Sequence, residues 1–259
     1  MKLSIVSDLH MEIWKHWFPE IDYGDADVVA FLGDIGNGLQ PLEMMKEVME
    51  AKEGRKVIYI IGNHEYYGHE LNDMNQKIRD KAKEYGIIIL DDATHEIDGI
   101  TFIGATLWTD YEVDPTMPTT AAMAVAARGI NDHRVIRNAK TGTMFSTRDA
   151  LTLNEYAKQF VFDEIEKAGR ENCVVLSHHS PTKQGIAPQF EGSPLNGAFN
   201  NDWDDLIKEK GPRIWAYGHT HWDVDLMIGD TRVVSRQLGY PGERVQTKQG
   251  EFEPLEIVL

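Results

Sequence analysis

Five short segments of the chain end an apolar run with one small residue and then a side chain that can bind a metal ion. A short apolar run that is bounded by a turn residue is typical of a buried strand. In an open α/β sheet the ligand site lies beyond the carboxyl ends of the strands, so these side chains can converge. Two carboxylates, one amide and several imidazoles suit a pair of divalent metal ions, which indicates a two-metal hydrolase. The metal-binding positions are Asp8, with His10 two residues later, Asp34, Asn63, His178, and the pair His219 and His221.

The spacing inside these segments indicates how each side chain could act. Asp8 and His10 lie two residues apart on one turn, so both can reach the same ion. Asp34 is placed to offer one carboxylate oxygen to each ion, which would hold the pair about 3.5–4 Å apart. Asn63 would bind through its side-chain carbonyl oxygen, and because this oxygen adds no charge the second ion stays more Lewis-acidic.

The order and spacing of the five segments resemble the calcineurin-like metallophosphoesterases. Each motif is weak alone, whereas five in one order are specific. The resemblance implies that Asp34 is shared by the two metals and that a hydroxide bridging both ions attacks phosphorus. It also implies that His64 is not a ligand but stabilises the transition state or protonates the leaving oxygen. The implied first metal site is Asp8, His10, Asp34 and His221, and the second is Asp34, Asn63, His178 and His219.

Two neighbouring histidines compete for one ligand position. In the other four segments the ligand directly follows the small residue, and by that register His178 after Ser177 is the ligand. Resemblance to purple acid phosphatases, in which the ligand stands two residues before a proline, would favour His179 before Pro181. We predict that His178 is the ligand and that His179 supports it or faces the substrate.

Residues from about 109 to 148 depart from a minimal phosphoesterase core and are predicted to form an accessory, cap-like segment. Between Pro115 and Arg148 the segment holds five basic residues and one acid, Asp132, in a chain whose net charge is −16. One interpretation is that His133 and Arg134 hold an anionic group of the substrate. The alternative is a solvated surface excursion, and the sequence leaves both open.

Composition restricts the class of protein. A length of 259 residues is enough for one large domain with two packed sheets, so we predict a single domain over residues 1–259. The acidic charge disfavours long nucleic acid as a partner, because proteins that bind its backbone present basic surfaces. We expect no membrane span, since the chain has no apolar stretch of about 18 residues. The single cysteine, Cys173, predicts a reducing, cytoplasmic location without a disulfide framework.

The elements that would position the ligands follow from the apolar runs, the prolines and the glycines. Strands alternate with helices in the first third of the chain, and Gly229-Asp230 predicts a hairpin near the end. The resemblance implies an α/β fold of two mixed sheets packed face to face with helices on the outer faces. Strands are predicted at 2–7, 28–32, 56–61, 86–90, 100–108, 173–177, 213–217, 222–228, 231–235 and 252–259, and helices at 41–51, 71–85, 148–168 and 202–210.

The expected function is metal-dependent hydrolysis of phosphate esters, with phosphodiesters of small nucleotide-like molecules as substrates. The alternatives are a phosphomonoesterase and a non-catalytic binding scaffold on the same fold, although the intact ligand set and His64 count against a scaffold. Mixed nitrogen and oxygen ligands admit manganese, iron, zinc, cobalt or nickel, of which we favour manganese. The oligomeric state is left open.

Overall fold

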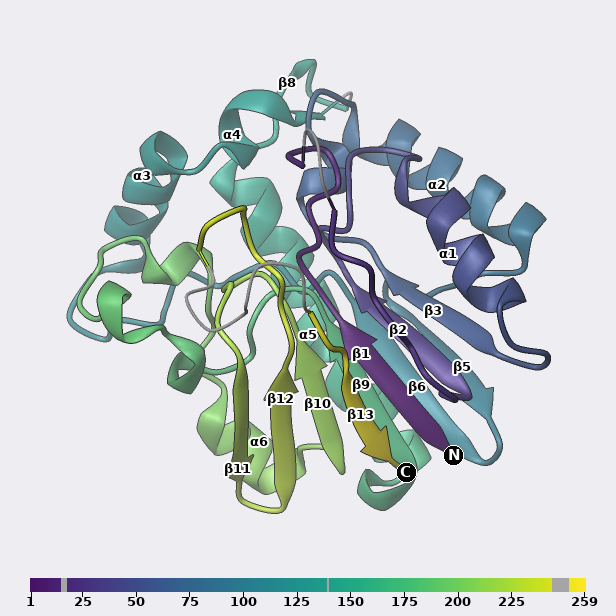
Figure 1. The fold of residues 1–259 in the computed structure, drawn as a ribbon. Helices are drawn as coiled ribbons and strands as arrows, with labels where there is room; N and C mark the ends of the chain where they lie inside the picture. The colour runs from purple at the N-terminus through teal and green to yellow at the C-terminus, as the bar shows by residue number, and fades with distance from the viewer. Residues whose placement is uncertain (15–17, 139, 244–251) are drawn as a thin grey trace.

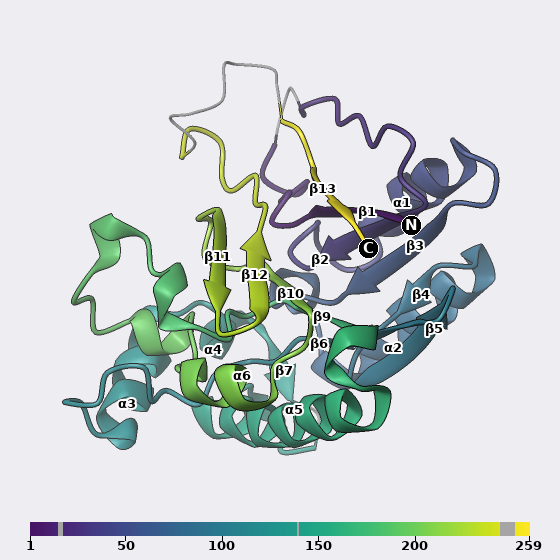
Figure 2. The ribbon, with the colours of Figure 1, turned by 90° about the horizontal axis from the view of Figure 1, so that it is seen from below.

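The computed structural model describes residues 1–14, 18–138, 140–243 and 252–259. Two large mixed sheets pack against each other, and helices cover their outer faces (Figures 1 and 2). The first sheet has the strand order β13 (Leu255–Val258), β1 (Lys2–Val6), β2 (Val28–Leu32), β3 (Lys56–Ile60) and β4 (Ile88–Ile89). The second has the order β11 (Val224–Ile228), β12 (Thr231–Ser235), β10 (Ile214–Tyr217), β9 (Cys173–Ser177), β6 (Ile100–Ala105) and β5 (Ala93–Ile97).

The strands that lead to the candidate ligands run parallel to their neighbours within each sheet. In the first sheet β1, β2 and β3 are parallel, and only the edge strand β13 runs against β1. In the second sheet β6, β9, β10 and β12 are parallel, whereas β5 and β11 run antiparallel at the two edges. Within each sheet the carboxyl ends of the parallel strands therefore all point in the same direction and lie side by side.

Each central strand is buried on both faces. In β2 the residues Val28, Ala30 and Leu32 face the core between the sheets, while Val29 and Phe31 belong to the core on the outer side. The outer side of this sheet packs on α1 (Pro41–Glu50) and α2 (Leu71–Tyr85). A strand that is covered on both faces reads as a continuous apolar run rather than as an alternating one.

Helices α5 (Thr147–Ala168) and α6 (Asp204–Lys210) cover the outer face of the second sheet (Figure 2). Ala157 and Val161 of α5 and Ile207 of α6 share one buried cluster with Trp215 of β10. Each sheet thus has one face on the other sheet and one face on helices, which confirms the predicted fold class. The predicted hairpin is also confirmed, because β11 and β12 pair with Ile228 opposite Thr231.

Some elements differ from the sequence-based prediction. The strand predicted to reach Trp108 ends at Ala105, because Leu107 and Trp108 take positive φ angles and leave the sheet. Strand β5 was not predicted, since the middle of this edge strand is exposed and polar. The sequence predicts no helix or strand within residues 109–147. The structure has four elements there: α3 (Thr119–Gly129), α4 (Asp132–Val135), β7 (Arg137–Asn138) and β8 (Thr143–Met144).

In the described ranges the remaining short elements are five 3₁₀ helices, at His64–Tyr66, Arg170–Asn172, Lys183–Gly185, Pro188–Phe190 and Asn196–Ala198. None of the helices in the described part of the chain is long and apolar enough to cross a membrane.

Candidate metal centre

The predicted metal-binding side chains meet where the two sheets end. Asp8, Asp34 and Asn63 follow β1, β2 and β3 of the first sheet, whereas His178 and His219 follow β9 and β10 of the second. Three groups of side chains have ligand atoms that lie within 4.8 Å of one another. The groups are Asp8, His10 and His221; His10, Asp34 and His64; and Asp34, His178 and His219.

The backbone at these positions is unusual. Asp8, His10, Asp34, His219 and His221 all have φ angles between 49° and 69°, the left-handed region that side chains with a Cβ rarely adopt. Such residues persist only where the surrounding structure holds them, and they cluster at functional sites. Here hydrogen bonds between loops hold them, since the Asp8 N–H donates to the Gly33 carbonyl at 3.0 Å and the His10 N–H to the Asp34 carbonyl at 2.9 Å.

Two of the small residues that precede the ligands are required by close packing. A Cβ atom on Gly62 would collide with the carboxylate of Asp34, and one on Gly218 would collide with Ser7 and Asp8. Glycine therefore lets the ends of β2 and β3, and those of β1 and β10, approach each other closely within the centre.

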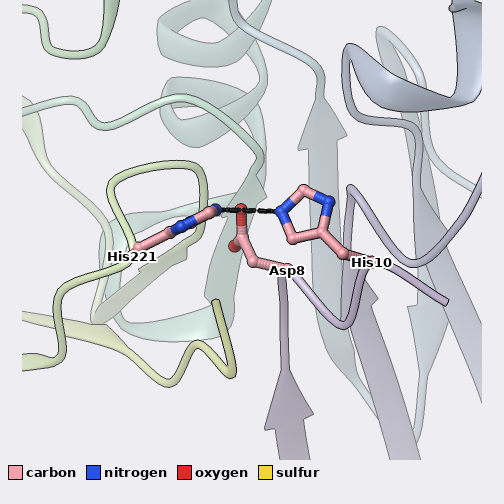
Figure 3. A group of neighbouring side chains, drawn as sticks. All are labelled: Asp8, His10 and His221. Atoms are coloured by element: carbon pink, nitrogen blue, oxygen red, sulfur yellow. Dashed lines mark hydrogen bonds and ion pairs between the residues drawn. The ribbon is translucent and has the colours of Figure 1, made fainter. Parts of the chain in front are cut away.

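The first group is built from Asp8, His10 and His221 (Figure 3). The Nε2 atoms of His10 and His221 lie 2.9 Å apart, and the Oδ1 atom of Asp8 lies 3.4 Å from His221 Nε2. The opposite ring nitrogens face carboxylates, with His10 Nδ1 3.2 Å from Glu12 and His221 Nδ1 2.6 Å from Glu243. In both rings Nδ1 faces a carboxylate, so Nε2 is the atom that would bind an ion in the centre.

The second group surrounds Asp34 and His178. His178 Nε2 lies 3.3 Å from Asp34 Oδ1, 3.0 Å from Asn63 Oδ1 and 3.2 Å from His219 Nδ1. The His178 Nδ1 atom donates to the Leu32 carbonyl at 2.7 Å, so Nε2 is the atom of this ring that would bind an ion. The other Asp34 oxygen, Oδ2, lies 4.0 Å from His10 Nε2 in the first group. The two oxygens of Asp34 thus face two different groups.

Asp132 of α4 fixes the side chain of Asn63. Asn63 Nδ2 donates to Asp132 Oδ1 at 2.8 Å, and the Tyr67 hydroxyl donates to the same oxygen at 2.7 Å. This contact turns the Asn63 amide nitrogen toward the 109–148 segment and its carbonyl oxygen toward His178.

His179 lies behind the centre. Its Nδ1 atom donates to the Thr106 carbonyl at 3.1 Å, and its ring lies 4.0 Å from the ring of His219. Burial, and next to it the neighbouring His178, lower the pKa of His179 to about 3, so the ring is neutral. His178, rather than His179, is the side chain that reaches the group of ligand atoms.

His64 lies at the rim of the centre. Its ring stacks on Tyr67 at 4.1 Å, Nδ1 lies 2.9 Å from Glu12, and Nε2 lies 3.2 Å from the Tyr240 hydroxyl. Burial opposes the charged form of His64, but Asp34 and Glu12 outweigh it and raise its pKa to about 9. Bound cations would offset the charge of Asp34, so Glu12 is the partner that would keep His64 protonated in a loaded centre.

Glu65, next to His64 in the chain, holds the loop of Asp34. Its buried carboxylate accepts hydrogen bonds from the backbone N–H groups of Asp34, Ile35 and Gly62 and from the Tyr59 hydroxyl. Burial, together with the charge of Asp34, raises the pKa of Glu65 to about 7. Glu65 therefore fixes the turn that places Asp34 between the two groups.

The two candidate substrate contacts of the accessory segment lie elsewhere. His133 Nδ1 donates to the Phe145 carbonyl at 3.1 Å and its ring stacks on Phe145. Arg134 is exposed, and its Nη2 atom donates to the Gly129 carbonyl. Neither lines the cavity beside the metal-binding groups. Their role as substrate contacts stays a prediction.

Besides Glu65, three further carboxylates of the centre have no role in the sequence-based prediction. Glu12 accepts from two histidines, Glu243 accepts from His221, and Asp132 accepts from Asn63. One feature of the sequence could have pointed to Asp132, since it is the single acidic residue between Pro115 and Arg148. No feature of the sequence points to Glu243, because its role depends on a contact with His221, 22 residues away in the chain.

A cavity of about 350 Å³ opens beside the centre. Asp34, Asn63, His64, His219 and His221 line it on the inner side. The opposite wall comes from residues 129–131 of the accessory segment and residues 185–200 of the loop after β9. The centre can therefore be reached by a small molecule.

The donor set fits divalent metal ions. Asp8 is fully buried and Asp34 is 2% exposed, yet among the described residues neither carboxylate pairs with a Lys or Arg. Burial opposes the charge on Asp34, but His178 and His64 hold its pKa well below the usual range. Buried charges are paired or bind metals, so a divalent ion could take the place of the ring protons beside these two carboxylates.

Comparisons with known proteins agree with this geometry. A family model of calcineurin-like phosphoesterases matches residues 1–223. An uncharacterized protein of Acanthamoeba polyphaga mimivirus is 26% identical over 270 residues, which cover 93% of this chain and 92% of that protein.

Solved structures share the fold at low identity. A phosphopantetheinyl hydrolase from Mycobacterium tuberculosis superposes with a TM-score of 0.69 and 16% identity, covering 98% of this chain and 95% of that one. A dimetal phosphatase from Danio rerio has a TM-score of 0.50 and 13% identity, and the match covers 91% of this chain and 87% of that one. With the family model matched over most of its length, the chain belongs to the calcineurin-like phosphoesterase family.

Proposed function

We propose that the chain is a dinuclear metallophosphoesterase that hydrolyses phosphodiesters of small nucleotide-like molecules. The observation that carries the proposal is the position of Asp34, whose Oδ1 lies 3.3 Å from His178 and whose Oδ2 lies 4.0 Å from His10. A carboxylate that faces two groups of ligands suits a bridge between two ions. The family makes hydrolysis of phosphoric esters the expected reaction.

The ligand atoms divide between two ions. Asp8, His10 and His221 with Asp34 Oδ2 would hold the first, and Asp34 Oδ1 with Asn63, His178 and His219 the second. Manganese is the ion we favour among those that such nitrogen and oxygen ligands accept. A bound pair would supply Lewis acidity toward the phosphoryl oxygens and would lower the pKa of a nearby water.

His64 supplies the proton chemistry in this proposal. Its Nε2 atom points to the centre, 3.8 Å from Asp34 Oδ2, and Glu12 holds the ring from the other side. As an imidazolium, His64 can donate a proton from Nε2 to the leaving oxygen of the ester, or stabilise the charge on the phosphoryl group.

The cavity favours a small diester over a monoester. A volume of about 350 Å³ lies near the lower limit of ligand pockets, which excludes long nucleic acid from the cavity itself. Among the described residues no Lys or Arg lines it. A diester carries one charge on its phosphate and a monoester close to two, so a site without extra cations favours the diester.

The experiment is a comparison of bis(p-nitrophenyl) phosphate and p-nitrophenyl phosphate, each with manganese, iron, zinc, cobalt and nickel. We expect faster hydrolysis of the diester, loss of activity with a chelator, and recovery with added manganese. The Asp34→Asn variant, purified in the same way, controls for contaminating phosphatases. A faster monoester would favour the second candidate, a phosphomonoesterase, and no hydrolysis with any metal would favour a scaffold.

A further inference from the structure

The outer wall of the cavity carries six apolar side chains although it faces the candidate metal centre, and the polar Asn131, Ser193, Asn196 and Asn200 border them. Six side chains of this wall carry no charge and no polar atom, and Phe190 among them is 53% exposed. A single exposed apolar side chain needs no explanation, but a contiguous apolar surface with a polar rim often marks a ligand-binding groove. The six are Ile130, Ile186, Ala187, Phe190, Leu195 and Phe199.

The wall is held at a fixed distance from the metal-binding side chains. Phe199 stacks on the ring of His219, with the ring centroids 4.9 Å apart. Gly129, at the end of α3, packs so closely on Leu195 that a Cβ atom would lie 2.6 Å from Leu195 Cδ2. The accessory segment and the loop after β9 therefore close the wall together.

We propose that this apolar wall, defined by the six residues above, is the subsite for an uncharged ester group of the substrate. The proposal rests on the proposed function, because it places the phosphate at Asp34 and His219. An ester group that is attached to a phosphate at this position extends into the same cavity. An apolar group gains free energy on that wall, at about 0.8 kcal/mol for each buried CH₂ group. A charged group would lose hydration without finding, among the described lining residues, a Lys or Arg to pair with.

The occupant follows from this chemistry. The wall favours an aliphatic or planar uncharged group, such as the nucleoside part of a nucleotide ester. It disfavours an ester group with a second phosphate or carboxylate. The subsite therefore selects among diesters by the charge of the group that is attached to the phosphate.

Three p-nitrophenyl diesters separate these possibilities, because they share the leaving group and the charge on phosphorus. Their second ester groups are methyl, hexyl and 5-carboxypentyl. With the manganese-loaded protein we expect kcat/KM for the hexyl ester to exceed that for the methyl ester at least tenfold. The carboxypentyl ester should fall at least tenfold below the hexyl ester.

Variants test whether the wall causes the preference. Ile186→Ala with Phe190→Ala should lower the hexyl-to-methyl ratio to within about twofold. The matched control is Tyr156→Ala, which removes a ring that is 62% exposed on α5 and does not line the cavity, and it should keep the ratio of the parent. Circular dichroism and thermal melting check that each variant is folded.

The outcomes distinguish the two proposals. Hydrolysis of the methyl ester without any preference for hexyl would overturn the subsite and leave the phosphodiesterase standing. An unchanged hexyl-to-methyl ratio in the Ile186→Ala, Phe190→Ala double variant would likewise overturn the subsite and leave the phosphodiesterase standing. No hydrolysis of any of the three esters would overturn the proposed function itself.

Discussion

The Asp132 carboxylate accepts a hydrogen bond from the Asn63 side-chain amide at 2.8 Å. Asp132 is 4% exposed and belongs to the accessory segment, whereas Asn63 follows a central strand of the first sheet. This contact is how a segment outside the two sheets reaches the metal centre, and it decides which atom of the Asn63 amide faces His178.

Replacement of Asp132 is expected to weaken metal binding. Asp132→Ala removes the nearer acceptor of the buried Asn63 amide and leaves it only the Tyr67 hydroxyl at 3.3 Å among the described residues. Loss of such a partner costs about 10- to 100-fold in metal affinity or activity. Asp132→Asn keeps a carbonyl acceptor and should lose less. The affinity is measured by titration of the metal-free protein with manganese, with the exposed Asp114→Ala as the control in the same segment. Equal affinities for all three variants would contradict the role of Asp132.

His64→Ala is expected to retain both metals and to lose turnover. Positioned acid–base groups contribute roughly 10²–10⁴-fold, so kcat should fall by that factor for an ester with a poor leaving group. The loss should shrink for nitrophenyl esters, whose leaving oxygen needs little protonation. An equal loss for both kinds of ester would mean that His64 stabilises charge on the phosphoryl group instead. Unchanged kcat on every ester would remove His64 from the mechanism.

The strand ends and their ligands could be predicted from the sequence because each depends on neighbours in the chain. An apolar run such as Phe31-Leu32 before Gly33-Asp34 encodes both the strand and the turn that follows it. Doubly buried strands carry this signal strongly, since every residue in them is apolar.

The accessory segment and the carboxylates around the histidines could not be predicted in this way. Helix α3 is rich in alanine, with only Ala122 and Ala126 buried, so it has little apolar periodicity to reveal it. The role of Glu243 depends on its contact with His221, 22 residues away, and that of Asp132 on its contact with Asn63, 69 residues away. Only the packing of distant segments creates these pairs.

Asp92 should make the stability of the fold depend on pH. Its buried Oδ1 atom has no hydrogen-bond partner in the part of the chain that the structure describes, and burial, with the nearby Asp91, raises its pKa to about 7. In the unfolded chain the usual value is about 3.9. As the pH rises from about 4 to above 7, the unfolded chain therefore releases this proton more readily than the folded one, and this group lowers the free energy of unfolding.

Asp92→Asn should raise the free energy of unfolding at pH 8, because the amide keeps the shape of the side chain but has no negative charge to bury. The gain should be nearly gone near pH 4, where Asp92 is protonated in the folded chain and only about half ionised in the unfolded chain. Urea unfolding at the two pH values measures it. Asp91→Asn is the contrasting variant, because it loses the 2.7 Å ion pair with Arg79 and should be less stable at pH 8. A gain of equal size at both pH values would exclude titration as the cause.

Asp34→Asn should cost more activity than the loss of any ligand that serves one ion. The substitution removes the charge that faces both groups, so metal content per chain should fall together with kcat. The comparison is with His221→Ala, which belongs to the first group alone. Metal analysis of both variants by mass spectrometry, alongside kcat, measures the difference. A variant of Asp34 with full metal content and ordinary turnover would exclude the bridge.

The most direct test of the dinuclear centre is a titration of the metal-free protein with manganese while hydrolysis of bis(p-nitrophenyl) phosphate is followed. If Asp34 joins two ions, activity should rise until two equivalents per chain are bound and then stay constant. A plateau at one equivalent, or full activity in the presence of a chelator, would contradict the two-metal phosphoesterase.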